Sequence, residues 1–404
     1  MTTGDPAAPG SPYLEGNLLR LLKNGEQYFP ALAAEIDGAR TEVFLETYIF
    51  ADDQTGSLVA DALARAAARG VAVRLLVDGF GTPELPSRLR QIMATAGVDI
   101  LVFRPSLLPS FLRRPRRPLR RMHRKIASID GRVAFVGGIN VIDDIDTPDP
   151  GPPRYDYAVR IEGPLAGFAH RESARLWLRV SWATFGRRWP ALLRLRGAER
   201  LATPPLPAPC GSQRAALVVR DSLRRRRAIE DEYLRLMDGA REEILVANAY
   251  FFPTRRFRRS LLAAARRGVR VTLLLQGRVE YVLQHYASRG LYRALLGAGV
   301  RIHEYHTSFL HAKVAVFDGR VATVGSSNID PFSLLLAQEA NVFVDDPAFA
   351  QELRESLLEA LRKGGRGVPA RYWQRLGWTL RLRIWLFYRL ARLLMSVFGF
   401  DRLR

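Results

Sequence analysis

A short sequence pattern that occurs twice constrains this chain more than any other feature. Residues 122–140 read MHRKIASIDGRVAFVGGIN, and residues 309–328 read FLHAKVAVFDGRVATVGSSN. At one offset of 188 residues (311 − 123), five positions agree: His123 and His311, Lys125 and Lys313, Asp130 and Asp318, Gly137 and Gly325, and Asn140 and Asn328. The chain has only four lysines among its 61 basic residues. Two of the four fall in this pattern, so chance agreement is hard to credit.

The segments around the pattern repeat as well. EVFLETYIF and LVADALARAAARGVAVRLLVDG, within residues 42–79, match EILVANAYFF and FRRSLLAAARRGVRVTLLLQG, within residues 243–277. The period is far longer than that of a solenoid repeat and equals the length of an ordinary domain. We therefore predict five parts: a flexible N-terminus (1–17), a first domain (18–201), a proline-rich linker (202–213), a second domain (214–366) and a tail (367–404).

Each half alternates the periodicities of strands and helices. In the first half, a strand in TEVFLETYIF leads to a helix near Leu58–Arg69, which Gly70 ends, and then to the buried strand VAVRLLVDG. In the second half we predict a helix near Leu223–Asp238, a strand over Glu243–Phe252 and a helix near Phe257–Arg267. Strand–helix–strand is typical of a parallel crossover. The predicted fold class is therefore α/β, with two similar α/β/α sandwich domains related by a pseudo-twofold axis.

The repeated pattern is suited to binding an anion. On a strand, alternate side chains share a face, so His-x-Lys presents an imidazole beside an ammonium group. The Asp-Gly pairs that follow predict tight hairpins, whose returning strands bring the G-[GS]-x-N segments back beside the histidine and the lysine. Small residues and amides in these segments can donate hydrogen bonds to a phosphate. The candidate phosphate-binding residues are Gly138, Asn140, Ser326 and Asn328.

Two such half-sites facing each other would surround one phosphorus atom. Two imidazoles provide a nucleophile on one side and an acid in line on the other, while two ammonium groups stabilise the phosphoryl oxygens. We predict no metal and no cofactor for such a site. The candidate catalytic residues are His123, Lys125, Asp130, His311, Lys313 and Asp318. Because the two aspartates occupy turns, we expect them to orient the histidines or the hairpins rather than to donate protons.

The complete pattern resembles the signature of the phospholipase D superfamily. It consists of H-x-K, four residues, Asp, six residues and G-[GS]-x-N, present twice. LLKNGEQYFPALAAEI, LETYIF, RRMHRKIASIDGRVAFVGGINV, YDYAVRIEGP and ANAYFFP are similar to segments of bacterial cardiolipin synthases, in the form that lacks N-terminal transmembrane helices. The resemblance extends over most of residues 18–345. It implies phospholipase D-like domains and a transferase of phospholipid biosynthesis.

The resemblance also implies a two-step reaction. One histidine attacks the phosphodiester of a phosphatidylglycerol and glycerol leaves, and a hydroxyl of a second lipid then attacks the phosphatidyl-histidine to give cardiolipin. We assign His123 as the nucleophile and His311 as the acid and later the base, and the near symmetry leaves the reverse assignment open. The second substrate is also open, because phosphatidylethanolamine, water or a small alcohol can attack the same intermediate.

Four further roles come with the resemblance. Lys125 and Lys313 clamp the phosphoryl oxygens, with help from the two asparagines of the pattern. In the family, carboxylates that follow the motifs hold the catalytic imidazoles. Asp156 in RYDYAVRI and Glu339 in AQEANVFV occupy these places.

The charge of the chain points to an anionic partner. The formal net charge is +21, which fits both nucleic acid and acidic phospholipid surfaces. A phosphodiesterase that hydrolyses phospholipid or cleaves nucleic acid is therefore one alternative, and a non-catalytic membrane-binding protein is another. We favour anionic phospholipids such as phosphatidylglycerol, together with the membrane surface, and consider nucleic acid unlikely, because a nuclease has no evident need for the tail described next. The oligomeric state is open.

The tail has the pattern of a basic amphipathic helix. One face is apolar: Trp373, Leu380, Ile384, Phe387, Ala391, Leu394, Met395 and Phe398. The other side carries arginines: Arg371, Arg375, Arg381, Arg389 and Arg392. We favour a helix in the plane of a membrane interface over one docked on the protein's own core. No signal peptide and no run of about 18 apolar residues is present, so we expect a peripheral protein of the bacterial cell membrane.

Other conspicuous segments receive simpler interpretations. His170, His285, His303 and His306 lie outside the repeated pattern, so we expect them to be structural or solvated. The acidic stretch DDIDTPDPGPP (143–153) is predicted to be a solvated loop rather than a metal site. The basic stretch RRPRRPLRR (113–121) is expected to contact lipid headgroups. A single cysteine, Cys210, excludes an internal disulfide.

Overall fold

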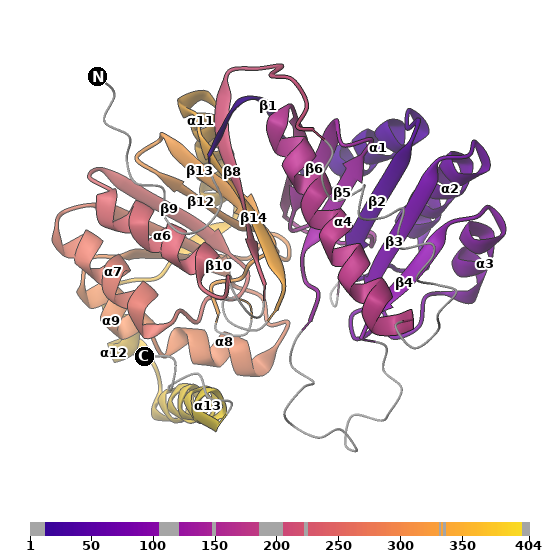
Figure 1. Ribbon diagram of the computed structural model, residues 1–404. Helices are drawn as coiled ribbons and strands as arrows, with labels where there is room; N and C mark the ends of the chain where they lie inside the picture. The colour runs from indigo at the N-terminus through magenta and orange to yellow at the C-terminus, as the bar shows by residue number, and fades with distance from the viewer. Residues whose placement is uncertain are drawn as a thin grey trace, which may run out of the picture.

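Both halves of the chain repeat one order of strands and helices (Figure 1). The computed structural model describes residues 13–104, 121–147, 151–185, 205–221, 225–330, 333 and 337–397. The first half contains β1 (Leu14–Lys23), α1 (Asn24–Asp37), β2 (Glu42–Thr47), α2 (Gln54–Ala68), β3 (Ala72–Asp78), α3 (Ser87–Thr95), β4 (Asp99–Phe103), β5 (Lys125–Ile129), β6 (Val133–Gly137), β7 (Tyr157–Glu162) and α4 (Pro164–Phe185).

The second half and the tail continue this order. The second half contains β8 (Gln213–Arg220), α6 (Ala228–Gly239), β9 (Glu243–Asn248), α7 (Arg255–Arg266), β10 (Arg270–Gln276), α8 (Val282–Arg289), α9 (Tyr292–Gly297), β11 (Arg301–Tyr305), β12 (Lys313–Phe317), β13 (Val321–Gly325), β14 (Glu339–Asp345), α11 (Pro347–Gly364) and β15 (Gly365–Gly367). The tail contains α12 (Tyr372–Arg375) and α13 (Trp378–Val397).

The strands of the described residues form one 15-stranded sheet, in the order β15-β11-β10-β9-β12-β13-β14-β8-β1-β7-β6-β5-β2-β3-β4. From the centre outwards, β1, β7, β6, β5, β2, β3 and β4 have as counterparts β8, β14, β13, β12, β9, β10 and β11. The two halves meet where β1 pairs antiparallel with β8, with Leu14 opposite Ala215 and Asn17 opposite Gln213. This mirrored order confirms the predicted α/β class and the pseudo-twofold.

The three largest apolar cores of the described residues hold the layers together. Helices α1, α2 and α3 cover one face of the first half, around Leu32 and Leu63. Helices α6 and α7 cover the corresponding face of the second half, around Tyr233 and Phe257. The third core is shared, because α4, α11 and strands of both halves bury their apolar side chains in it. Burial of apolar surface stabilises by roughly 25 cal/mol per Å². The shared core therefore holds the two halves as one body.

The predicted Asp-Gly hairpins are confirmed. Asp130 and Gly131 connect β5 to β6 with φ of 53° and 64°, and Asp318 and Gly319 connect β12 to β13 with φ of 51° and 62°. Two successive residues in the left-handed region are the mark of a type I′ turn, which glycine and aspartate tolerate better than other residues. The same turn chemistry thus sets the register of both hairpins.

The first predicted domain boundary is wrong. β1 begins at Leu14, so the flexible N-terminus does not extend to residue 17. Residues 14–17 are already held by the central pairing, where Asn17 Nδ2 donates to Leu14 O at 2.7 Å and Asn17 Oδ1 accepts from Leu165 N at 2.8 Å. Of the predicted linker, residues 202–204 lie outside the described residues, and β8 begins at Gln213. The division of the chain at this linker remains a prediction.

Several predicted elements have different limits in the structure. The helix predicted from Leu58 begins at Gln54, because Asp53 Oδ1 caps it by accepting from Gly56 N at 2.7 Å. The two motif strands begin at Lys125 and Lys313, so each histidine lies just before its strand rather than on it. The lysines thus remain on strands, while the histidines belong to segments whose neighbours come from the other half.

The tail helix α13 docks on α8, at one end of the second half (Figure 1). Ile384 is fully buried there, and Phe387 stacks on Tyr286 with ring centroids 5.5 Å apart. Tyr388 packs so closely on Gly290 that a Cβ there would lie 2.7 Å from the tyrosine ring. Where it is described, the apolar face predicted for the membrane is therefore turned to the protein. Phe398 lies outside the described residues, and so do residues 105–120, which include most of the basic stretch.

A different apolar face of α13 is exposed to solvent. It carries Trp378, Leu382, Trp385, Leu386, Leu390 and Leu393. Among the described residues, no helix is both long enough and apolar enough to cross a bilayer.

Candidate active site

The two copies of the repeated pattern meet at one edge of the sheet, where β5 and β12 begin beside the ends of β2 and β9. Each histidine-bearing segment pairs with the chain of the other half. His123 N donates to Gln338 O at 2.9 Å, and His311 N donates to Tyr155 O at 2.8 Å. Parallel bridges join Met122 to Gln338 and Tyr155 to Leu310. The backbone therefore crosses between the halves at both motifs.

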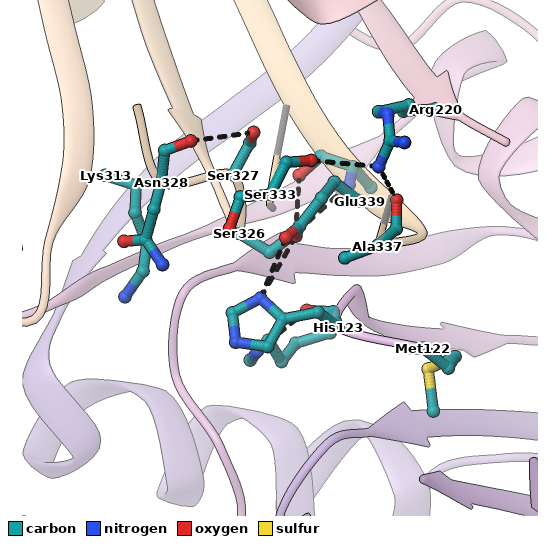
Figure 2. A network of polar contacts seen from close by, with 12 residues as sticks. Met122, His123, Arg220, Lys313, Ser326, Ser327, Asn328, Ser333, Ala337 and Glu339 are labelled. Atoms are coloured by element: carbon teal, nitrogen blue, oxygen red, sulfur yellow. Dashed lines mark hydrogen bonds and ion pairs between the residues drawn. The ribbon is translucent and has the colours of Figure 1, made fainter. Parts of the chain in front are cut away.

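A carboxylate from the opposite half holds each imidazole. His311 Nδ1 lies 2.6 Å from Asp156 Oδ2. His123 Nδ1 lies 3.0 Å from Glu339 Oε1, and Figure 2 shows this second pair. Both predicted carboxylates thus contact a motif histidine, and the structure adds that each contact joins the two halves. A carboxylate on Nδ1 fixes the ring and leaves Nε2 available for chemistry.

The two carboxylates are structural equivalents. Gly137 pairs with Ala158 across β6 and β7, and Gly325 pairs with Asn341 across β13 and β14. In this register Asp156 of the first half corresponds to Glu339 of the second. The pseudo-twofold therefore relates the two histidine–carboxylate pairs as well as the two motifs.

Gly138 and Ser326 support these carboxylates and do not face a phosphate, which corrects the sequence prediction. The N–H of Gly138 donates to Tyr157 O at 3.0 Å, and a Cβ at this position would collide with Asp156 Oδ1. Ser326 N donates to Ala340 O at 3.0 Å, and its hydroxyl donates to Glu339 Oε2 at 2.5 Å (Figure 2). Gly138 has no side chain and therefore leaves room for the carboxylate of Asp156. At the equivalent position, the hydroxyl of Ser326 holds the carboxylate of Glu339.

Both motif lysines are buried among these groups. Lys125 Nζ donates to His123 O at 2.7 Å, and Lys313 Nζ donates to His311 O. Lys313 Nζ also lies 2.8 Å from His311 Nδ1 and 3.7 Å from Asp156 Oδ2. Burial lowers the pKa of Lys125 to about 7 and that of Lys313 to about 8. The ammonium charges are thus poorly solvated, which favours binding of an anion.

Burial also shapes the protonation of the imidazoles. It lowers the pKa of His123 and lowers the pKa of His311 further, because burial disfavours the charged form of each ring. Burial alone would raise the pKa of Glu339, but the adjacent His123 keeps that pKa below its ordinary value. His123 contributes to the lowered pKa of His311, so the two rings interact within one site.

The motif asparagines differ in their hydrogen bonds. Asn140 Oδ1 accepts from Ile49 N at 3.3 Å, which ties β6 to the segment after β2. Asn328 Oδ1 is buried and has no hydrogen-bond partner among the described residues. Figure 2 shows its side chain beside that of Lys313. The side-chain oxygen of Asn328 is therefore unused by the described residues, whereas that of Asn140 is occupied by the backbone.

Asp130 and Asp318 lie away from the imidazoles, so their inclusion among the catalytic residues is wrong. They occupy the opposite ends of β5 and β12 from Lys125 and Lys313. Asp130 accepts from Arg40 N, Thr41 N and Glu42 N at 2.8–2.9 Å, and Asp318 accepts from Arg241 N, Glu242 N and Glu243 N at 2.9 Å. Each aspartate braces its hairpin against the strand beside it, which is one of the two roles expected for it.

Sequence reasoning missed two groups that shape the site. The ring of Tyr48 packs on His123 with centroids 4.9 Å apart and lies 5.4 Å from Lys125 Nζ. Arg220 is fully buried and donates to Ser333 O at 2.9 Å and to Ala337 O, which holds the chain that leads to Glu339 (Figure 2). The place of Tyr48 directly after β2 was a usable signal. Nothing local distinguishes Arg220 from the many other arginines.

His170 is one of the four histidines outside the repeated motifs that are expected to be structural or solvated. His170 is buried, and its Nε2 lies 3.0 Å from Glu42 Oε1. Among the described residues, no group of three histidine, cysteine or carboxylate side chains could hold a metal ion.

Comparisons with known sequences identify one family, and a solved structure shares the fold. A family described as "Cardiolipin synthase, PLD-like domain" matches residues 32–144 and 233–361. Cardiolipin synthase B of Escherichia coli K12 is 40% identical over 352 residues, which cover 85% of this chain and 80% of that protein. Cardiolipin synthase B of Salmonella typhimurium is 41% identical over 345 residues, with 85% and 80% coverage. The crystal structure of phosphatidylserine synthase from Haemophilus influenzae is similar in fold, with a TM-score of 0.66, 12% identity and 95% of both chains covered.

Asp130 braces a hairpin and Glu339 contacts an imidazole, so substitutions at the two positions should have different effects on the pKa of His123. Asp130→Ala removes hydrogen bonds to a charged acceptor, so the free energy of unfolding falls by about 1–3 kcal/mol. The pKa of His123, followed by NMR of its ring protons, stays at its parent value. Glu339→Gln removes the negative charge that favours the imidazolium, so it lowers the pKa of His123 further. An equal shift of that pKa in Asp130→Ala would contradict the assignment of this aspartate to the hairpin.

Proposed function

We propose a reaction for this chain from the premise that it belongs to the family of cardiolipin synthases with phospholipase D-like domains. It is therefore a phosphatidyltransferase that acts on phospholipids. The reaction that we propose moves a phosphatidyl group from one phosphatidylglycerol to another, through a phosphatidyl-histidine, and releases glycerol. The crossing of the two histidine–carboxylate pairs carries this proposal, because it brings two oriented imidazoles from different halves into one buried site.

In the first step, Nε2 of His123 attacks phosphorus and the bond from phosphorus to the glycerol oxygen breaks. His311 donates a proton to that oxygen, so glycerol leaves as a neutral alcohol. A bound phosphodiester is anionic and raises the pKa of a neighbouring imidazole, so His311 can carry this proton in the complex although burial lowers its pKa in the free protein. Glu339 stabilises the positive charge that forms on the His123 ring.

In the second step, a glycerol hydroxyl of the second phosphatidylglycerol attacks the same phosphorus. His311 takes the proton of this hydroxyl, the bond from phosphorus to nitrogen breaks, and cardiolipin forms. Each step breaks one bond to phosphorus and forms another, so no external energy source is needed. Lys125, Lys313 and Asn328 stabilise the phosphoryl oxygens in both steps.

The first test is the reaction itself. Purified protein and phosphatidylglycerol vesicles should give cardiolipin and glycerol in equal amounts, measured by lipid mass spectrometry and a glycerol assay. His123→Ala should lower the rate by about 10⁴-fold or more, since no other group in the site replaces a covalent nucleophile. EDTA should leave the rate unchanged. Cleavage of DNA without formation of cardiolipin would overturn the proposal.

A donor with a good leaving group tests which histidine is the nucleophile. A nitrophenyl ester of phosphatidic acid needs no acid, so His311→Ala should still form a covalent adduct on His123, which peptide mass spectrometry can locate. His123→Ala is the matched control and should form none. An adduct on His311 in the His123→Ala protein would reverse the two roles.

The buried lysines predict how the rate depends on pH. Burial lowers the pKa of Lys125 to about 7 and of Lys313 to about 8, so rising pH removes the charges that bind phosphate. Therefore kcat/KM should fall as pH rises through this range. As pH falls below 6.5 it should not decline, because burial lowers the pKa of His123 from that ordinary value and keeps the nucleophile neutral, while His311 gains the proton that it donates. A kcat/KM that still rises above about pH 9 would contradict these assignments.

Exposed apolar side chains support a peripheral place at the bacterial membrane. Phe80 follows β3, and Val279, Tyr281 and Val282 follow β10, at the edge of the sheet that carries the imidazoles. The exposed face of α13 adds two tryptophans and four leucines beside α8. Exposed arginines flank this face, including Arg383 and Arg389. Apolar side chains among cationic ones suit the interface of an anionic bilayer.

This surface can be tested without touching the imidazoles. The combined change of Trp378, Trp385 and Leu386 to serine should weaken sedimentation with phosphatidylglycerol vesicles by about tenfold or more, since three apolar side chains lose their burial in lipid. The control changes Leu18 and Leu206 to serine, because both are exposed apolar residues at the opposite edge of the sheet. Equal binding of the two variants would refute the proposed orientation.

A further inference from the structure

A hollow lies beside the catalytic edge, between the ends of β9 and β10 and helix α8. It encloses about 380 Å³ of space between atoms, including its open side. Its polar lining includes Tyr250, Arg278, Glu280, Tyr281, Gln284 and His285. This volume counts solvent at the open side, so the enclosed part is smaller than ordinary ligand sites and leaves no room for acyl chains.

The hollow adjoins the half-site of His311. Lys313 pairs with Asn248 at the end of β9, and the next residue, Ala249, lines the hollow. Ala249 N donates to Ala312 O at 3.0 Å, between the motif histidine and lysine. Glu280 is close enough to raise the pKa of Lys313 against the stronger effect of burial. A group in the hollow therefore lies on the side of the site that carries His311 and Lys313.

The hollow breaks the pseudo-twofold. A single helix, α3, lies between β3 and β4, whereas both α8 and α9 lie between β10 and β11. Phe50 and Phe251 form equivalent bridges, to Val141 and to Ile329, so the counterpart of Tyr250 is the apolar Ile49. The polar wall therefore belongs to the second half, on the side where an alcohol leaves and another arrives.

The chemistry of the wall fits hydroxyl groups. Tyr250 donates to Glu280 Oε2 at 2.5 Å, and burial raises the pKa of Tyr250 well above its ordinary value, so the phenol keeps its proton. Gln284 Oε1 is buried and has no hydrogen-bond partner among the described residues. A polyol needs both donors and acceptors, which these groups provide. The carboxylate of Glu280 disfavours a phosphate at the same spot.

We propose that this hollow is the alcohol subsite, which holds the glycerol that leaves the donor and then the glycerol headgroup of the acceptor. Glu280 and Tyr250 bind its hydroxyls, so they determine which acceptor reaches the phosphatidyl-histidine. The inference rests on the proposed function. It also explains how transfer competes with hydrolysis, because a positioned hydroxyl has a large effective concentration relative to water.

The experiment separates the two steps with a nitrophenyl ester of phosphatidic acid as donor and short-chain phosphatidylglycerol as acceptor. Nitrophenol release reports the first step and needs no glycerol recognition. The ratio of cardiolipin to phosphatidic acid reports the choice between acceptor and water. In Glu280→Gln and in Tyr250→Phe we expect this ratio to fall about tenfold or more, while release falls by no more than about threefold.

Tyr13→Phe is the matched control. Its hydroxyl donates to Glu232 Oε1 at 2.7 Å, as Tyr250 donates to Glu280, but it lines neither the hollow nor the motifs. It should change neither readout. An unchanged ratio in both hollow variants, or a loss of release as large as the loss of transfer, would overturn the proposal. If the parent protein yields only phosphatidic acid, it does not transfer to an acceptor. That result contradicts the proposed function before any variant is compared, and the subsite proposal is then also wrong.

Discussion

The crossed contacts between imidazole and carboxylate are the constraint on which the rest of the structure depends. His123 is oriented by Glu339 of the second half, and His311 by Asp156 of the first. Neither half alone therefore contains an oriented histidine. The pairing of β1 with β8 and the shared core around α4 and α11 keep the halves in the one arrangement in which both contacts form.

This arrangement places several charges where water cannot solvate them. An unpaired buried charge costs several kcal/mol, so each must meet a partner. The lysines donate to the carbonyls of the motif histidines, Ser326 donates to Glu339, and the space at Gly138 admits Asp156. Apolar burial in the shared core offsets the part of the cost of burying these charges that the hydrogen bonds do not cover. The lowered pKa values of both lysines follow from the same burial, so the site is prepared for an anion before any ligand arrives.

Symmetry and asymmetry serve different parts of the proposed reaction. Phosphoryl transfer in line needs similar groups on both sides of phosphorus, which duplication supplies. Discrimination between alcohols needs groups on one side only, and among the described residues α8 and its polar wall belong to the second half. Helix α13 rests on α8, so one helix separates the proposed alcohol subsite from the proposed membrane surface. The proposed alcohol subsite and the proposed membrane surface therefore belong to neighbouring helices.

The amino-acid sequence by itself determined the duplication, the α/β class, the hairpins and the identity of both motifs, because these follow from local periodicity and turn chemistry. It also identified Asp156 and Glu339, but not that each serves the other half. Only the tertiary structure decided that Asp130 and Asp318 brace hairpins, that Gly138 and Ser326 support carboxylates, and which face of α13 is buried. The physical reason is that a partner's position depends on how distant segments pack. A helix with apolar residues on two faces has no local signal that tells which face docks.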